Sequence, residues 1–179
     1  IGKSSTWRFL DDGSDQGTAW RDVDFNDSTW RRGRAQLGYG DGDEVTRIQS
    51  GPTDNHHITS YFRTTFNVTS PQNLDALRLS LLRDDGAIVY LNGEEIVRSN
   101  MPNGSVNART VAAVNVGGSA ESSFFRFNID PTLLLSRDNV LAVEVHQRSD
   151  TSSDVSFDLE LIGGKKKTNP QTIYYTLDD

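Results

Sequence analysis

The sequence predicts an all-β protein, built as an antiparallel β-sandwich of the jelly-roll kind. Apolar and polar residues alternate over several short segments, and this period of two is typical of strands that bury one face. Turn-forming residues, including the Asn-Gly pair at 92–93, separate those segments. Nearly no segment carries the 3.6-residue period of a helix. Short strands joined by turns at this spacing are typical of sandwiches.

The first strand is expected at 6–10, where the sequence TWRFL is short, aromatic and alternating. Trp20, Phe25 and Trp30 follow in polar sequence that has neither a strand period nor a helix period. One interpretation of Trp20 and Trp30 is that they pin a long irregular loop onto a core. The other interpretation is a platform on which a sugar ring stacks.

Two polar segments lead to the next strand. Residues 37–44 (LGYGDGDE) combine carboxylates with glycines and are expected to form a turn. Residues 50–59 are expected to form a polar loop that contains a histidine pair. Residues 60–68 alternate clearly and predict a strand. The residues expected to face the core from it are Phe62, Phe66 and Val68.

The best-defined stretch is 77–97, which predicts three strands in succession. Leucines alternate with more polar residues at its start, as in a strand with one buried face. Asp84-Asp85-Gly86 then forms a corner, because Asp side chains hydrogen-bond their own backbone and Gly accepts a positive φ. Asn92-Gly93 is the pair that a two-residue type I′ hairpin requires. A β-meander with two adjacent carboxylates at one corner is therefore expected at the centre of the chain.

The second half predicts further strands at 110–116, 124–129, 139–147 and 154–162. One helical turn is expected from Asp130 to Ser136, because Pro131 suits the first position of a helix. The last strand closes the meander with one apolar face. The residues on that face are Val155, Phe157, Leu159 and Leu161.

The length of 179 residues suits one sizeable core, so residues 1–162 are predicted to form one sandwich domain. Residues 163–179 change in character, beginning with the basic, flexible segment GGKKK and continuing to TIYYTL. We interpret 163–179 as a linker followed by an orphan strand. That strand either pairs on a sheet edge or starts a following domain.

Composition narrows the classes of partner. A net charge of −7 disfavours a nucleic-acid surface or an anionic membrane as partner, and it favours Ca²⁺ or a neutral ligand. The chain has no cysteine, which excludes disulfides, thiol nucleophiles and thiolate metal sites. No apolar run approaches the roughly 18 residues of a membrane span.

The loop after the first strand is the leading candidate for a Ca²⁺ site, because Ca²⁺ takes six to eight oxygen ligands from a flexible loop. Asp11, Asp12 and Asp15, with the chain around Thr18, supply most of such a shell. Glu160 is a candidate distant ligand, since jelly rolls often place the first and last strands together. The alternative is an Asx-rich turn that holds no ion. Two other acidic segments stay open as cation loops, namely 41–44 and 84–85.

Candidate ligand-binding residues are aromatic rings for stacking and polar side chains for hydrogen bonds to sugar hydroxyls. Glu144 and His146 share one face of their strand. No serine elbow or second base accompanies them, so the sequence predicts no catalytic triad and no enzyme. The candidates are Trp20, Trp30, Tyr39, Asp84, Asp85, His146 and Arg148.

Several motifs in order, among them WRFLDDGSDQGTAW, LGYGDGD, LRDDGAIVYLNGEEI and NVLAVEVHQ, resemble a galactose-binding-like jelly-roll module over residues 6–161. Modules of this kind, similar to carbohydrate-binding modules, are accessory domains of large secreted bacterial proteins. The chain is more loosely similar to the sugar-binding jelly roll of family 2 glycoside hydrolases. The tail YYTLD resembles the start of the C-terminal β-domain of chitobiase-type hexosaminidases, with Asp179 where that motif has Gly. Asp84-Asp85 locally resembles the paired aspartates of flocculin-type adhesins, which bind Ca²⁺ and sugar hydroxyls together.

These resemblances imply a non-catalytic carbohydrate-binding module appended to a multidomain, secreted or cell-surface bacterial protein. They also imply a structural Ca²⁺ beside the first long loop, in the context of Asp12-Gly13, Thr18 and Trp20. The expected partners are a polysaccharide or glycan and the neighbouring domains, with the module itself monomeric. The alternative is an architectural or adhesive spacer without a soluble ligand.

Overall fold

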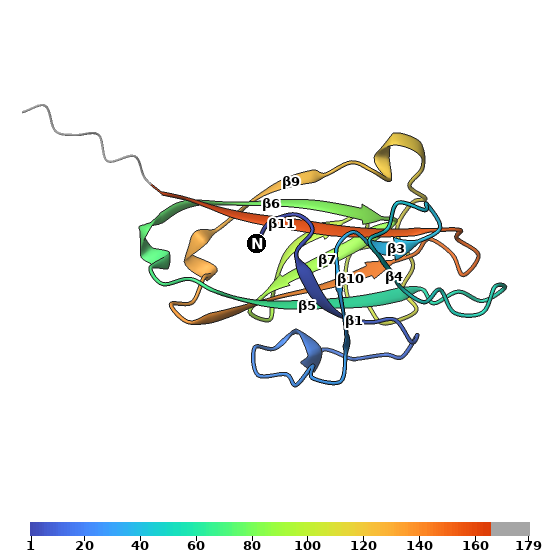
Figure 1. Ribbon diagram of the computed structural model, residues 1–179, viewed down its shortest axis with the longest axis horizontal. Coiled ribbons are helices and arrows are strands. Elements are labelled where there is room, and N and C mark those ends of the chain that lie inside the picture. The colour runs from blue at the N-terminus through green and yellow to red at the C-terminus, as the bar shows by residue number, and fades with distance from the viewer. Residues whose placement is uncertain (166–179) are drawn as a thin grey trace, which may run out of the picture.

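The protein folds as two packed β-sheets, and the computed structural model describes residues 1–165 of the chain. One sheet is six-stranded and antiparallel, and we call it sheet A. The other is five-stranded, and we call it sheet B; it is antiparallel except for one parallel pair, β3 with β4. Figure 1 shows sheet B above sheet A. The prediction of an antiparallel β-sandwich is therefore confirmed.

Sheet A has the strand order β2 (Arg31–Arg34), β1 (Thr6–Leu10), β5 (Thr59–Asn67), β10 (Asp138–His146), β7 (Gly86–Leu91) and β8 (Glu94–Ser99). Sheet B has the order β4 (Thr46–Arg47), β3 (Leu37–Tyr39), β11 (Val155–Lys165), β6 (Leu74–Asp84) and β9 (Phe125–Ile129). Four short 3-10 turns complete the described elements: η1 (Ala19–Arg21), η2 (Pro71–Asn73), η3 (Gly118–Ala120) and η4 (Pro131–Leu133).

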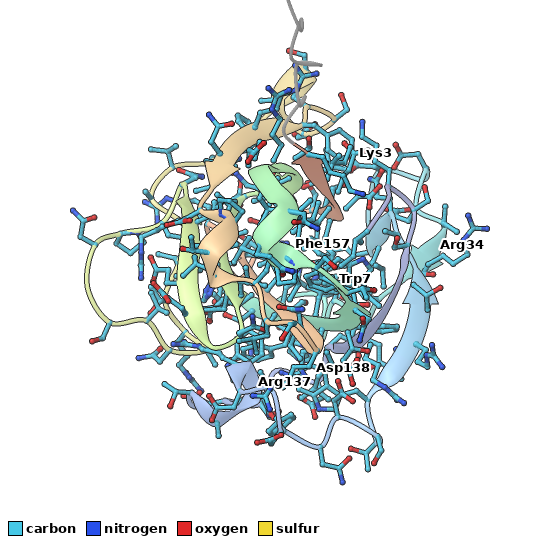
Figure 2. All side chains as sticks on the ribbon, turned by 90° about the vertical axis from the view of Figure 1, so that its left-hand side faces the viewer. Lys3, Trp7, Arg34, Arg137, Asp138 and Phe157 are labelled. Carbon is cyan, nitrogen blue, oxygen red and sulfur yellow. The ribbon has the colours of Figure 1, made fainter. Side chains whose placement is uncertain are left out.

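The main core lies between the sheets, where β6 and β11 run side by side for most of their length. The alternating faces predicted for these strands point inward, including all four apolar residues predicted for β11. Phe157 stacks on Phe62 of β5 with 4.2 Å between ring centroids, and Trp7 of β1 meets Phe157 edge-on at 5.0 Å. Figure 2 shows Trp7 and Phe157 together in the interior. The aromatic residues of three strands therefore close the centre of the sandwich.

A second apolar cluster lies on the outer face of sheet A, between that sheet and the chain from β1 to β2, which runs below the sheet in Figure 1. In it, Trp20 is 0% exposed and packs edge-on against Tyr61 and Tyr90, with ring centroids 4.9 Å and 5.8 Å away. Trp30, 6% exposed, stacks beside Trp20 at 6.4 Å. The two tryptophans thus pin a long loop onto the sheet, and neither ring is open to a sugar.

The meander at 77–97 forms as predicted. Its hairpin turn has positive φ at both central residues, 55° at Asn92 and 91° at Gly93, which is the type I′ requirement. The helical turn expected after Asp130 is η4, and the Asp130 carboxylate accepts a hydrogen bond from the Thr132 amide at 2.9 Å. Local chemistry was therefore sufficient for these turns.

Two predictions about strands were wrong. Residues 110–116 are a loop, because isolated hydrogen bonds, Ala112 N–H to Gln147 O and Ala113 N–H to Asn100 O, replace a continuous ladder. The strands β2, β3 and β4 were missed, because their short sequences carry little alternation. They become strands by tertiary pairing: β2 pairs with β1, β3 pairs with β11, and β4 pairs with β3.

The loops that matter for function gather at one end of the sandwich, on the right in Figure 1. There the β6–β7 turn meets the segments 40–45, 51–58, 100–124 and 147–154. The turns η2 and η4 lie at the opposite end (Figure 1). Among residues 1–165, no helix has the length and apolar character needed to span a membrane. The orphan strand predicted at 172–177 lies outside the described residues.

Candidate functional site

The β6–β7 turn is the centre of the candidate site. Asp84 and Asp85 are each 2% exposed and are joined by a cis peptide bond. Gly86 follows, where a Cβ atom would lie 2.6 Å from the Asn100 carbonyl oxygen and 2.7 Å from the Met101 sulfur. Only glycine therefore lets the segment after β8 pack against this turn.

The Asp85 carboxylate ties two loops to the turn. Its Oδ1 accepts a hydrogen bond from the Val116 amide at 2.6 Å, and its Oδ2 accepts one from the Arg148 amide at 2.7 Å. These amides belong to the 100–124 and 147–154 loops, which follow different strands. A single buried carboxylate therefore positions both loops.

Three more carboxylates lie at this end. The carboxylate oxygens of Asp41, Glu121 and Asp154 can all come within 4.8 Å of one another. Charge interactions connect this trio with the turn, since the negative charges of Asp154 and Glu121 both raise the pKa of Asp84. We call Asp41, Asp84, Asp85, Glu121 and Asp154 the acidic corner. Within residues 1–165, none of its members forms a salt bridge.

Burial and mutual repulsion alter the acidity of the corner. Burial, followed by the charge of Asp85 and then of Asp154, raises the pKa of Asp84 from 3.8 to about 8. Burial and the charge of Asp41 likewise raise the pKa of Asp154. Burial lowers the pKa of Arg83, despite the charges of Asp84 and Asp85. Without a bound cation, the corner therefore holds protons that ordinary carboxyl groups would release.

This acidity predicts a pH dependence of stability in a metal-free buffer. Asp84 carries a folded pKa near 8 and an unfolded value near 3.8, so the folded protein binds the extra proton between these limits. The free energy of unfolding is then expected to fall as pH rises from about 4 to about 8. Urea denaturation at pH 5 and at pH 8 in the presence of a chelator measures this change.

The matched variant is Asp84→Asn, which keeps the side-chain shape and removes the titrating group. Its stability is expected to vary less between pH 5 and pH 8 than that of the parent chain. The groups facing Asp84 stay in place, namely Arg83, Asp85, Glu121, Asp154 and Tyr39. An equal slope in both proteins would show that Asp84 does not hold the extra proton.

A polar groove of about 490 Å³ lies at the same end, and we call it the loop-end groove. It runs between the 51–58 loop and the loops that Asp85 holds. The backbone at 56–57 is irregular, which lets both adjacent histidines line one groove. Its polar side chains are Asn55, His56, His57, Arg109, Arg148, Ser149 and Asp150.

The histidines of the groove are oriented by backbone carbonyls. His56 Nδ1 lies 2.7 Å from the Ser152 oxygen, and His57 Nδ1 lies 2.9 Å from the Asp11 oxygen. A carbonyl oxygen only accepts, so each Nδ1 carries a proton and donates it. Arg109 and Arg148 are exposed and add donors. The groove therefore offers donors and acceptors together, as hydroxyl groups require.

Among the residues predicted to bind a ligand, the structure brings Arg148 into the groove and places Asp84 and Asp85 beside it. Tyr39 is 5% exposed, and its hydroxyl accepts a hydrogen bond from Gln147 at 3.0 Å. Trp20 and Trp30 lie under the β1–β2 loop on sheet A. These three aromatic rings are therefore structural, since none presents a face to solvent.

His146 is fully buried and belongs to a polar network. Its Nδ1 lies 2.9 Å from Thr59 Oγ1 and 2.7 Å from the Thr110 carbonyl, and its Nε2 lies 3.1 Å from a Glu144 oxygen. Glu144 also accepts a hydrogen bond from Tyr90 at 2.6 Å and pairs with Arg21 at 3.1 Å. Burial would raise the Glu144 pKa, but His146, Tyr90 and Arg21 outweigh it and lower that pKa. Glu144 and His146 therefore join β10 to neighbouring loops. Neither side chain lies on a surface where a ligand could bind.

In the predicted Ca²⁺ loop, 11–18, the carboxylates accept hydrogen bonds from protein groups. Asp11 is buried and accepts hydrogen bonds from Arg31 at 2.9 Å and from the Gln49 amide at 2.6 Å. Asp12 accepts from the Ser14 amide, and Asp15 accepts from the Gly17 amide, each at 2.9 Å. Thr18 is exposed and precedes η1.

Glu160 lies elsewhere, in a groove of about 460 Å³ on the outer face of sheet B. Lys3, Arg78 and Arg126 line that groove with it. The structure therefore does not gather Asp11, Asp12, Asp15 and Glu160 around one point. A Ca²⁺ ion in the 11–18 loop stays a prediction.

Sequence reasoning missed Glu121, Asp154 and Arg109 as site residues. Asp154 was visible only as a polar residue at the start of a strand, and Glu121 and Arg109 lie in irregular sequence. Asp41 and the aspartate pair were recognised, but as separate loops. No local pattern connects the segments around Asp41, Asp84-Asp85 and Asp154. Their proximity results from the pairing of β11 with both β3 and β6.

Comparison with solved structures finds this sandwich within glycoside hydrolases. A β-glucuronidase 2 of Bacteroides uniformis aligns with a TM-score of 0.58 and 19% identity, over 89% of this chain and 17% of that chain. A glycosyl hydrolase family 2 member from Bacteroides cellulosilyticus aligns with a TM-score of 0.55 and 11% identity, over 90% of this chain and 20% of that chain.

At these identities the likeness concerns the fold, and this chain spans a fifth or less of the length of either enzyme. No known family model matches the sequence. No curated protein matches it either. The predicted similarity to a family 2 glycoside hydrolase sandwich is thus confirmed at the level of fold.

Proposed function

We propose that this chain is a non-catalytic accessory module of a multidomain carbohydrate-active protein, and that the loop-end groove binds a glycan. The observation that carries the proposal is the lining of the groove. Two histidine side chains, two arginine side chains and Asp150 line one groove. Sugar hydroxyls both donate and accept, so such a mixed lining suits them.

A binding role is also supported by the number of carboxylates in the groove. Glycosidases place two carboxyl groups about 5–9.5 Å apart across the scissile bond. Asp150 is the only carboxylate among the residues that line the groove. Hydrolysis of a glycoside would need a second carboxyl group facing it.

The lining also indicates modest affinity. Its described residues include no Trp, Tyr or Phe, so stacking on a benzene or indole ring contributes nothing there. Binding then depends on hydrogen bonds from charged donors, each worth about 1.5–3 kcal/mol. Loss of one arginine is therefore expected to be measurable.

Arg148→Ala is expected to weaken glycan binding about tenfold or more, since 1.4 kcal/mol corresponds to a factor of ten. The substitution keeps the Arg148 amide that Asp85 holds. Affinity electrophoresis through gels that contain a panel of neutral polysaccharides measures the change, after a glycan array has identified a ligand.

Arg137→Ala is the matched control. Arg137 is exposed at the opposite end of the molecule, which faces the viewer in Figure 2. Its removal is expected to leave retention unchanged. Equal loss in both variants would place binding outside the groove, and silence across the array and all gels would favour the alternative of a spacer without a soluble ligand.

A further inference from the structure

We propose that the outer face of sheet B, where β9 forms an open edge, is a docking surface for an extended acidic peptide segment. The surface combines the groove of about 460 Å³ that contains Glu160 with the free edge of β9, and we call it the β9 face. It shares no lining residue with the loop-end groove. Docking at the β9 face therefore does not depend on glycan binding at the loop-end groove.

The β9 face has a local excess of positive charge. Lys3, Arg78 and Arg126 line its groove and are all exposed. Glu160 is the one carboxylate among the described residues of the lining. This excess is opposite in sign to the net charge of −7 of the whole chain. A surface of this sign attracts carboxylates, so charge complementarity favours an acidic partner.

Strand register places the two arginines next to each other. Arg126 of β9 lies opposite Ser80 of β6, and Arg78 lies two residues from Ser80 on the same face of β6. Such diagonal neighbours are about 7–8 Å apart, so their like charges repel. Glu160 accepts a hydrogen bond from the Ser80 hydroxyl at 3.4 Å. Within residues 1–165, neither arginine forms a salt bridge, which leaves both guanidinium groups to a partner's carboxylates.

The β9 face also presents apolar surface that a partner would cover. Ile162 is 53% exposed and lies directly opposite Arg78 in the β11–β6 pair. Phe124 is half-buried, and the Lys3 ammonium lies 3.7 Å from the centroid of its ring. Arginine and aromatic residues are enriched at protein interfaces, where they combine charge with packing. The composition of this face is therefore typical of a protein interface.

The edge of β9 favours a peptide over an anionic polysaccharide. β9 is the last strand of sheet B and pairs with β6 on one side, and Figure 1 shows it along the upper edge of that sheet. In the part of the chain that the structure describes, no backbone hydrogen bond other than this ladder involves 125–129. An extended peptide satisfies such open N–H and C=O groups by adding a strand, which a sugar chain does not.

The added strand would place every second side chain on the outer face, beside Arg126. Acidic residues at these positions would meet both arginines of the β9 face. Pairing of two copies of this chain through β9 is disfavoured, because it would bring like-charged arginines to the same edge. The expected occupant is therefore a peptide in which acidic residues alternate with others.

The test uses the full chain and a fluorescent synthetic peptide of about eight residues in which Glu alternates with Thr. Fluorescence anisotropy at pH 7.5 and 50 mM NaCl is expected to show saturable binding. At 500 mM NaCl, binding is expected to weaken about fivefold or more, because salt screens the charges. A peptide with Gln in place of each Glu is expected to bind about tenfold more weakly. The Glu peptide with all backbone amides N-methylated is expected not to bind, since it cannot complete a ladder.

The double variant Arg78→Gln, Arg126→Gln is expected to weaken peptide binding about tenfold or more while keeping the β-sheet circular dichroism spectrum. Arg32→Gln is the matched control, because Arg32 is an exposed arginine on β2, an edge strand of sheet A. It is expected to bind the peptide as the parent chain does. Hydrogen exchange at 125–129 is expected to slow when the peptide is added.

Absence of saturable binding to the Glu peptide would overturn the docking surface. Equal losses in Arg32→Gln and in the double variant would overturn it too, and would move the peptide to β2. Equal binding of the N-methylated peptide would overturn strand addition at β9. Tighter binding of polygalacturonate than of the peptide, lost in the double variant, would assign the face to an anionic polysaccharide and overturn the peptide partner.

Discussion

Phe157→Ala is expected to lower the free energy of unfolding by about 3–5 kcal/mol, the largest effect of any single substitution considered. Phe157 is 0% exposed, stacks on Phe62 and meets Trp7 edge-on, so its removal leaves a cavity between the sheets. The neighbouring strands are fixed by their ladders and fill that cavity only in part. Urea denaturation followed by circular dichroism measures the loss, which corresponds to a fall in melting midpoint of roughly 6–20 °C.

Phe124→Ala serves as its control, because it removes the same side chain from a different environment. Phe124 is half-buried outside the sandwich, where Lys3 lies over its ring at 3.7 Å. Its loss is expected to cost less than half as much. Equal costs for the two variants would contradict the assignment of Phe157 to the centre of the core.

Arg63→Met is expected to lower the free energy of unfolding by about 3 kcal/mol and to release the β1–β2 loop. Arg63 is 1% exposed and donates to Asp27 Oδ2 at 3.0 Å, to the Asp22 carbonyl at 3.2 Å and to the Trp20 carbonyl. Methionine fills similar volume but leaves these acceptors without a donor. The carboxylate of Asp27 keeps its pair with Arg8 at 3.2 Å, which limits the cost.

The measurement combines urea denaturation with tryptophan fluorescence. Exposure of Trp20 and Trp30 is expected to shift their emission to longer wavelength before global unfolding. Arg34→Met is the control, since Arg34 is exposed and accounts for one weak contact, to the Ser4 carbonyl at 3.4 Å. Its stability is expected to stay within about 0.5 kcal/mol of the parent. A parent-like spectrum and stability for Arg63→Met would show that the loop is held by packing alone.

The acidic corner and the loop-end groove are positioned by the same loops. Asp85 holds the amides at 116 and 148, and these segments carry both the corner and the walls of the groove. Stability at this end therefore depends on how the negative charge is balanced. A proton on Asp84 and a bound cation are two ways of reducing the same repulsion, so the pH dependence is expected in the metal-free protein.

Sequence reasoning was weakest for the site. It recognised Asp84-Asp85, Asp41 and Arg148, but it assigned them to separate loops. It favoured the 11–18 loop for Ca²⁺ because Asp11, Asp12 and Asp15, with the backbone carbonyls around Thr18, could supply most of a ligand shell. The structure shows those carboxylates engaged with nearby amides or with Arg31. Composition reveals that ligand atoms exist, whereas coordination depends on which of them remain unpartnered in three dimensions.

The sequence by itself determined the all-β class, the central meander, its type I′ hairpin and the inward faces of β6 and β11. Each follows from chemistry within a few residues, namely alternation with a period of two and the backbone freedom of Asn, Asp and Gly. Only the tertiary structure decided that Trp20 and Trp30 are buried, that 31–47 contributes three strands, and that Asp41, Glu121 and Asp154 meet. Those outcomes depend on strand order and on pairing between distant segments. A local sequence pattern describes one segment only. A long-range contact depends on two distant segments, so neither segment's pattern predicts it.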